Sequence, residues 1–157
     1  MKFASLLILM GGLASASPIL ISLDNPNQTS APGFTLSFTG TLTNTTAATL
    51  FINSDSFNLN SALTGDDSPF LNNAPVSLDP PNPSLDFQMF TVTLPAGTAP
   101  GQYLGDLTVL GGATADDQTV LGDVAFSVIV PTPEPSAMWL TPAALAFFLM
   151  RRRRART

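Results

Sequence analysis

The chemistry open to this chain is limited first by the side chains that its central part lacks. The sequence contains no His and no Cys, and its six basic residues are Lys2 and five arginines after residue 150. Residues 17–130 therefore cannot form Ser-His-Asp, Cys-His or Ser-Lys pairs of nucleophile and base. Zinc sites with thiolate or imidazole ligands are excluded for the same reason. Carboxylates, hydroxyls, amides and backbone groups remain.

Ten carboxylates lie in residues 17–130, because Glu134 is the one acidic residue outside this range among the eleven in the chain. All ten are aspartates: Asp24, Asp55, Asp66, Asp67, Asp79, Asp86, Asp106, Asp116, Asp117 and Asp123. No cation accompanies them, so this part has a formal net charge of −10, whereas the whole chain has −5. Nucleic acid and anionic lipid are recognised through Lys and Arg, and both are therefore poor partners for it.

Two uses of carboxylates are compatible with this composition. A glycosidase needs only two of them, but no Asp pair stands out by its spacing, and we expect the protein not to be an enzyme. Calcium prefers oxygen ligands, and the candidates are the doublets Asp66-Asp67 and Asp116-Asp117, both in expected turns. No EF-hand motif surrounds them. Because Asp favours turns through its own hydrogen bonds, we expect turn-forming residues there, with no metal and no other cofactor.

The pattern of apolar residues predicts β-strands. Residues 34–43 alternate between apolar side chains and Thr or Ser, and residues 103–109 and 120–130 also repeat with period two. The alternation changes phase within residues 85–94, which indicates a β-bulge, and again near residues 53–56. No stretch between residues 17 and 130 has helical periodicity. The alternation predicts one core that contains Phe34, Leu36, Phe38, Leu107, Val109, Val124, Phe126 and Val128.

Clusters of turn-forming residues separate these runs, at 25–27, 44–46, 65–69, 79–83, 95–97 and 111–112. About seven strands in so short a stretch predict an all-β fold, an immunoglobulin-like sandwich of two antiparallel sheets over residues 17–130. The segment 94–103 resembles the entry to a late strand of immunoglobulin-like bacterial surface modules. That resemblance implies a tyrosine corner, in which the Tyr103 hydroxyl bonds to upstream backbone. The alternative is that Tyr103 is an ordinary half-buried strand residue.

Residues 1–16 have the three parts of a secretory signal peptide. Lys2 supplies a positive charge, residues 3–13 are apolar, and Ala14 and Ala16 form an A-x-A cleavage site. We expect a signal helix that is cleaved after Ala16, so that the exported protein begins at Ser17. The partners of this segment would be the export translocon and signal peptidase.

The C-terminal end is a second targeting signal. Residues 131–135 form a proline-rich linker, residues 136–150 are uncharged, and residues 151–157 are rich in Arg. As a helix, residues 136–150 would rise about 22 Å, which is less than the ~30 Å of the hydrocarbon core. The arginines should stay in the cytoplasm. We therefore expect a short transmembrane segment that holds the protein in the inner membrane only transiently.

This end of the chain resembles the PEP-CTERM sorting tail. The resemblance covers residues 131–157, and it departs from the common pattern at Thr132, where Val is usual, and at Pro142 inside the apolar segment. It implies recognition by an exosortase, a membrane protease of bacteria that make exopolysaccharide, and it implies exopolysaccharide as a partner. The residues that carry it are Pro133, Glu134, Pro135, Arg151, Arg152, Arg153 and Arg154.

Together, these features predict an exported, exosortase-processed structural or interaction protein of the cell surface or extracellular matrix. The first alternative is a calcium-assisted polysaccharide-binding module. The central residues have no Trp and one Tyr to stack on sugars, which weakens this alternative. The second alternative is a small glycan-active enzyme.

Overall fold

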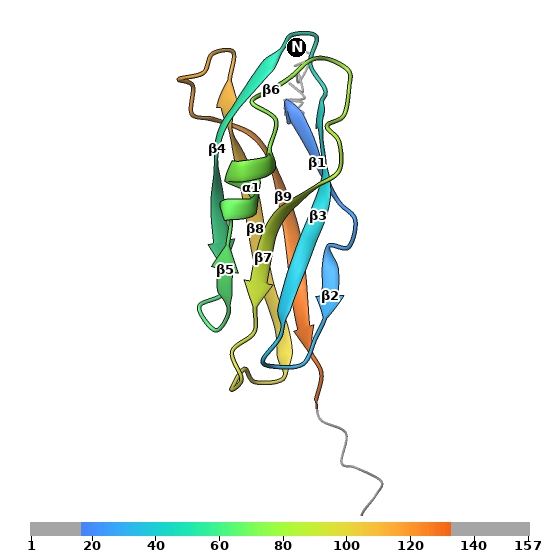
Figure 1. The fold of residues 1–157 in the computed structure, drawn as a ribbon, viewed down its shortest axis with the longest axis vertical. Helices are drawn as coiled ribbons and strands as arrows, with labels where there is room; N and C mark the ends of the chain where they lie inside the picture. The colour runs from blue at the N-terminus through green and yellow to red at the C-terminus, as the bar shows by residue number, and fades with distance from the viewer. Residues whose placement is uncertain (1–16, 133–157) are drawn as a thin grey trace, which may run out of the picture.

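The structure, a computed structural model, describes residues 17–132, which form two β-sheets packed face to face (Figure 1). The expected all-β fold with two sheets is confirmed. Within these residues, no helix is long and apolar enough to cross a membrane. The expected helices at 1–16 and 136–150 lie outside the described residues. The elements are β1 (Ile19–Leu23), β2 (Asn27–Thr29), β3 (Thr35–Asn44), β4 (Leu50–Leu59), β5 (Thr64–Asp66), α1 (Ser68–Asn73), β6 (Ser77–Leu78), β7 (Phe87–Thr93), β8 (Gly101–Gly112) and β9 (Thr119–Val130).

The strand order is that of an immunoglobulin-like sandwich. One sheet has the order β1-β3-β7-β5 and the other has the order β2-β9-β8-β4-β6. The first sheet corresponds to strands A-B-E-D of the immunoglobulin fold, and β9-β8-β4 of the second sheet corresponds to strands G-F-C. These seven strands match the expected number, and β2 and β6 are two short additions. The expectation of purely antiparallel sheets was wrong at β2, which pairs with β9 in parallel.

Four phenylalanine rings fill the middle of the core. Phe38 and Phe90 come from the first sheet, and their ring centroids lie 4.6 Å apart. Phe126 from the second sheet lies 5.0 Å from Phe38 and 4.7 Å from Phe90. Phe57 lies 4.9 Å from Phe90. Rings at these separations attract one another beyond the burial of their area, so the cluster holds the two sheets together.

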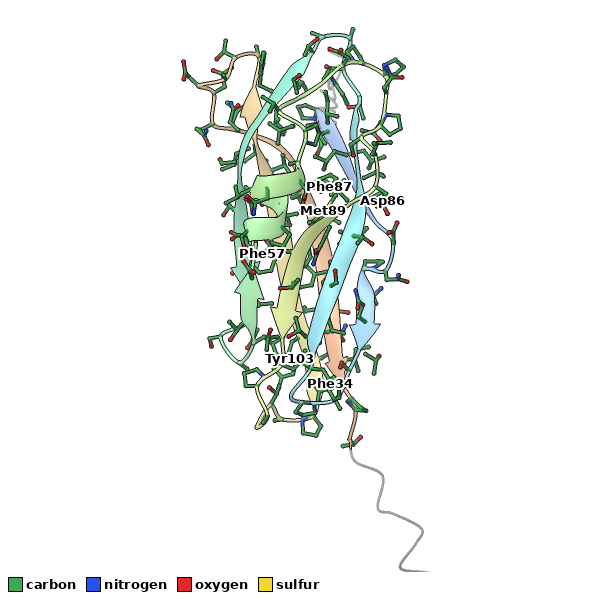
Figure 2. All side chains as sticks on the ribbon, viewed as in Figure 1. Phe34, Phe57, Asp86, Phe87, Met89 and Tyr103 are labelled. Atoms are coloured by element: carbon green, nitrogen blue, oxygen red, sulfur yellow. The ribbon has the colours of Figure 1, made fainter. Side chains whose placement is uncertain are left out.

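The predicted core is confirmed at five of its eight positions, with Phe38, Leu107, Val109, Phe126 and Val128 all buried. Leu36 and Val124 are partly buried against it. The prediction was wrong for Phe34, whose side chain is 63 % exposed. This residue has the phase of an inward position, but it precedes the first residue of β3. Figure 2 shows it at the lower end of the sandwich, away from Phe57 and Met89.

Three β-bulges reset the alternation. Met89 is the extra residue of β7, since Phe38 pairs with Phe90 and Thr39 with Gln88, so the expected bulge is confirmed. Asn53 is the extra residue of β4 opposite β8, which explains the phase change near residues 53–56. Leu121 is the extra residue of β9. That third bulge places Leu121 in the core and leaves Val120 exposed, contrary to the expected phase.

The tyrosine corner is present. The Tyr103 hydroxyl donates a hydrogen bond of 2.7 Å to the carbonyl oxygen of Ala99, four residues upstream. Tyr103 lies near the start of β8, the strand that corresponds to F in the immunoglobulin-like order. The bond ties the loop between β7 and β8 to the sheet.

Helix α1 was not expected from the sequence. Pro69 lies in its first turn, where proline is favoured because its missing N–H has no helical partner to lose. The buried ring of Phe70 lies 5.9 Å from the ring of Phe87 in β7. A six-residue helix is too short to show a 3.6-residue period and depends on this tertiary contact for its stability.

Candidate functional site

Among the described residues, one buried side-chain oxygen has no hydrogen-bond partner, and it is Oδ2 of Asp55 in β4. The bulge at Asn53 determines where this side chain points. Before the bulge Ile52 faces the core, and after it Asp55 pairs with the buried Val109 and so faces inward as well. The Asp55 side chain therefore lies on the core-facing side of β4, where it is partly buried.

The pKa of Asp55 is raised from its usual 3.8 to about 6. Burial is the largest cause, because it disfavours the charged form, and the charge of Asp67 is the second. The backbone N–H of Asp55 itself partly opposes both. Residues 17–132 contain no Lys, Arg or His that could offset the charge.

The two residues of the doublet Asp66-Asp67 have different surroundings at the start of α1. The Asp66 carboxylate accepts hydrogen bonds from the Ser68 hydroxyl and from the Ser68 backbone N–H, the latter at 3.1 Å. The bond from the hydroxyl is the larger cause of a lowered Asp66 pKa. Asp67 is the N-cap residue, but its side chain makes no capping hydrogen bond. Its charge acts on Asp55 instead.

The doublet Asp116-Asp117 lies in the loop between β8 and β9. The Asp117 carboxylate accepts a 2.8 Å hydrogen bond from the Thr114 backbone N–H, while Asp116 is exposed. The Asn53 side chain donates to the carbonyl oxygens of Thr114 at 3.0 Å and Asp117 at 2.7 Å. The loop therefore anchors the bulge in β4. Across residues 17–132, no three acidic, His or Cys side chains are grouped so that they could hold a metal ion.

An open pocket of about 110 Å³ lies between α1 and β4. Ile52–Ser54 form one wall, Phe70 and Leu71 of α1 form the other, and Ala74 and Val76 complete it. No carboxylate lines the pocket, and it is smaller than the few hundred Å³ of a typical small-molecule site. It is a gap beside the helix, and its lining offers no catalytic pair.

The outer face of the β1-β3-β7-β5 sheet carries mainly hydroxyl side chains, together with Leu20, Gln88 and Asp66, and we call it the hydroxyl face. Thr35, Thr93 and Thr64 lie opposite one another on β3, β7 and β5. The hydroxyls of Thr35 and Thr93 are joined by a 2.8 Å hydrogen bond. Neither β3 nor β7 carries a charged residue. The hydroxyl face comprises Ser22, Thr35, Ser37, Thr39, Thr41, Thr43, Thr64, Thr91 and Thr93.

The sequence pointed to the two Asp doublets and missed Asp55. The available signal was an Asp between Ile52 and Phe57, in a strand whose alternation changes phase. The other candidate site residues lie outside the described residues. These are Ala14 and Ala16 of the signal cleavage site, and Pro133, Glu134, Pro135, Arg151, Arg152, Arg153 and Arg154 of the sorting motif.

No family model and no curated protein matches this chain. Native E. coli alpha-2-macroglobulin is similar in structure, with 20 % identity over 74 % of this chain and a TM-score of 0.50, and the match spans 7 % of that protein. The C. elegans MSP family member WR4 matches 70 % of this chain and 96 % of its own, at 15 % identity and a TM-score of 0.40. Domains 4 and 5 of the S-layer protein SbsC match at 17 % identity, covering 72 % of this chain and 45 % of theirs, with a TM-score of 0.40. The alpha-2-macroglobulin match supports the sandwich fold alone.

Proposed function

We propose that this chain is an exported, non-catalytic protein of the bacterial cell surface or extracellular matrix, with the sandwich as a structural or interaction module. The observation that carries the proposal is the pair of targeting signals at the two ends of the sequence. In this proposal residues 1–16 form the signal helix and residues 136–150 form the short membrane helix. An exosortase then removes the tail at the inner membrane, and the sandwich is released to the surface or matrix.

The shape of the sandwich is compatible with this role. The chain enters it at Ile19 beside Asn44 and leaves it at Val130 beside Gly101. Figure 1 shows these two points at opposite ends of the long axis. A tail attached after Val130 would therefore present the far end, with the β3–β4 and β8–β9 loops, away from the membrane. The missing catalytic groups in residues 17–132 support a non-catalytic module.

The processed protein should begin at Ser17 and lack residues 139–156 when it is recovered from the envelope or medium of its native host. Intact-mass spectrometry measures both ends at once. Replacing Pro133-Glu134-Pro135 with three alanines should leave the tail in place while the N-terminus is still cleaved after Ala16. A wild-type protein that keeps Trp139 and the arginines as its main form would contradict processing of the tail.

The hydroxyl face favours a second candidate function, the binding of an uncharged polysaccharide. Strands in a sheet lie about 4.8 Å apart and alternate residues about 6.7 Å apart, so the face is a regular grid of donors and acceptors. Thr is stiff about χ1, which reduces the entropy lost when a repeating ligand is bound. Asp66 lies opposite Thr91 at the β5 edge of this face, whereas Asp106 and Asp123 lie on inner strands of the opposite sheet, on its outer face.

Two Ser–Thr pairs in equivalent positions provide a matched test of this second function. Ser37 faces Thr91 across β3 and β7 on the hydroxyl face, and Ser56 faces Thr108 across β4 and β8 on the other sheet. If the hydroxyl face binds, S37A/T91V should weaken co-sedimentation of the full-length chain with microcrystalline cellulose by about three- to tenfold, since two hydrogen bonds are lost. The S56A/T108V variant should bind as the wild type does.

The same assay separates the other possibilities. Equal binding by both variants would eliminate the hydroxyl face as the site. Loss of wild-type binding in EDTA would favour the calcium-assisted alternative. Absence of binding to cellulose would remove the second function and leave the proposed export and processing untouched, because those are measured by mass.

A further inference from the structure

Helix α1 is attached firmly to one sheet and weakly to the other. Its buried Phe70 packs on Phe87 of β7, whereas its contact with β4 is slight and leaves the open pocket beside Ile52. Within the helix, the Phe70 N–H donates to the Asp67 carbonyl oxygen and the Ala74 N–H donates to that of Phe70, both at 2.8 Å. A helix of this length can detach without disturbing the ladders of the two sheets.

An unfavourable pair of charges lies close to the start of α1. The Oδ2 atom of Asp55 is buried without a partner, and Asp67 at the helix N-cap is the neighbouring charge that acts on it. If the helix moved away, water would reach Asp55 and the two carboxylates would separate. Both changes favour the ionised form of Asp55.

Few titratable groups lie on the elements around Asp55. Its partner across β8 is Val109, and Asp106 of that strand lies on the outer face, bound to Asn58. Neither β7 nor α1 contains a titratable residue. On β5, the Asp66 carboxylate is bound to Ser68. Asp67 is thus the one titratable neighbour that opposes ionisation of Asp55, and no cation in residues 17–132 favours it.

We propose that residues 67–74 form a flap over the open edge of the sandwich, which is closed while Asp55 is protonated and is released when Asp55 and Asp67 both carry charge. An open flap would uncover the edge of β4 after Ile52, whose N–H donates to the Val76 carbonyl oxygen. Beyond Ile52, β4 pairs with β8 only. The flap would therefore open more often at neutral pH than in acid.

The direction of the pH dependence follows from the raised pKa of Asp55. The closed state holds the proton up to about pH 6, whereas an exposed Asp releases it near 3.8. Between these values the closed state binds more protons, so closure weakens as the pH rises and levels off above about pH 7. Because Asp55 is only partly buried, solvent screens its charge and reduces the effect of its raised pKa. We therefore expect the opening constant to increase about tenfold between pH 4 and pH 7.

Amide hydrogen exchange in the full-length chain tests the flap. After correction for the intrinsic exchange rates, protection of the Phe70 and Ala74 amides should fall about tenfold from pH 4 to pH 7. The amides of Val109 and Val128, in the central ladder, should show no such local change. In D55N the flap amides should lose this dependence. The outward-facing D123N variant should keep it, and D67N should shift its midpoint to lower pH.

A second measurement keeps the test valid if a variant folds poorly. The Asp55 carboxyl carbon of the wild type can be titrated by NMR, and its midpoint should coincide with that of flap protection. Flap protection that stays constant across this pH range, or that changes equally in D55N, would overturn the proposal. An Asp55 midpoint near 4 would overturn it as well.

Discussion

Replacing Phe126 with Ala should lower the free energy of unfolding by about 3–5 kcal/mol, the cost typical of removing a large core side chain. Phe126 is 3 % exposed, and its ring lies within 6 Å of three others, those of Phe38, Phe57 and Phe90. It joins the second sheet to the first, so a cavity at this position is bounded by strands that cannot collapse inward independently. The free energy of unfolding of a domain is typically about 5–15 kcal/mol, so this replacement would remove much of the stability.

Urea unfolding of the full-length chain, followed by circular dichroism, measures this effect. Phe34 supplies the control, since it is also a phenylalanine but is 63 % exposed at the end of the sandwich. Its replacement by Ala should change stability by less than about 0.5 kcal/mol, as is usual for surface positions. Similar losses at the two positions would contradict the assignment of Phe34 to the surface and Phe126 to the core.

Replacing Asn44 with Ala should cost about 2–4 kcal/mol, because it leaves buried backbone groups without partners. Asn44 ends β3 and is 1 % exposed. Its side-chain nitrogen donates to the carbonyl oxygens of Ala48 at 2.7 Å and Leu78 at 2.8 Å. Its side-chain oxygen accepts from the Thr46 N–H at 2.9 Å and the Thr46 hydroxyl at 2.8 Å. One amide thus holds the β3–β4 turn and the short β6.

The same urea measurement applies, with Asn82→Ala as the control. Asn82 is exposed in the loop before β7, and its side chain makes no hydrogen bond within residues 17–132. Its replacement should change stability little. An N44D variant distinguishes the two halves of the amide, since it keeps an acceptor for Thr46 but loses the donor to Leu78. If N44D and N44A were both as stable as the wild type, this network would not stabilise the sandwich.

Much of the sandwich follows from short-range patterns in the sequence. Alternation in residues 34–43 places Phe38 inward and the threonines outward, because successive side chains of a strand point to opposite faces. The Pro-Gly-rich entry before Tyr103 led to the tyrosine corner, whose hydrogen bond spans only four residues. The net charge of −10 in residues 17–130 follows from the amino-acid composition alone.

The candidate site could not be derived in this way. Asp55 faces inward because the bulge at Asn53 shifts the alternation by one residue. That bulge is held by hydrogen bonds from Asn53 to Thr114 and Asp117, about sixty residues away in the chain. The charge of Asp67 acts on Asp55, and Asp67 is held between β5, which pairs with β7, and α1, whose Phe70 packs on Phe87. None of these partners is near Asp55 in sequence, so local periodicity carries no information about its pKa.

By itself, then, the sequence determined the long strands and the single acidic module, and it predicts the two targeting signals, since each depends on residues that are close together in the chain. The tertiary structure alone decided the exposure of Phe34, the formation of α1, the regular grid of the hydroxyl face and the burial of Asp55. The physical reason is that burial and electrostatics depend on which strands pair and where their bulges fall. Those choices are made by contacts between distant segments, such as Asn53 with the β8–β9 loop.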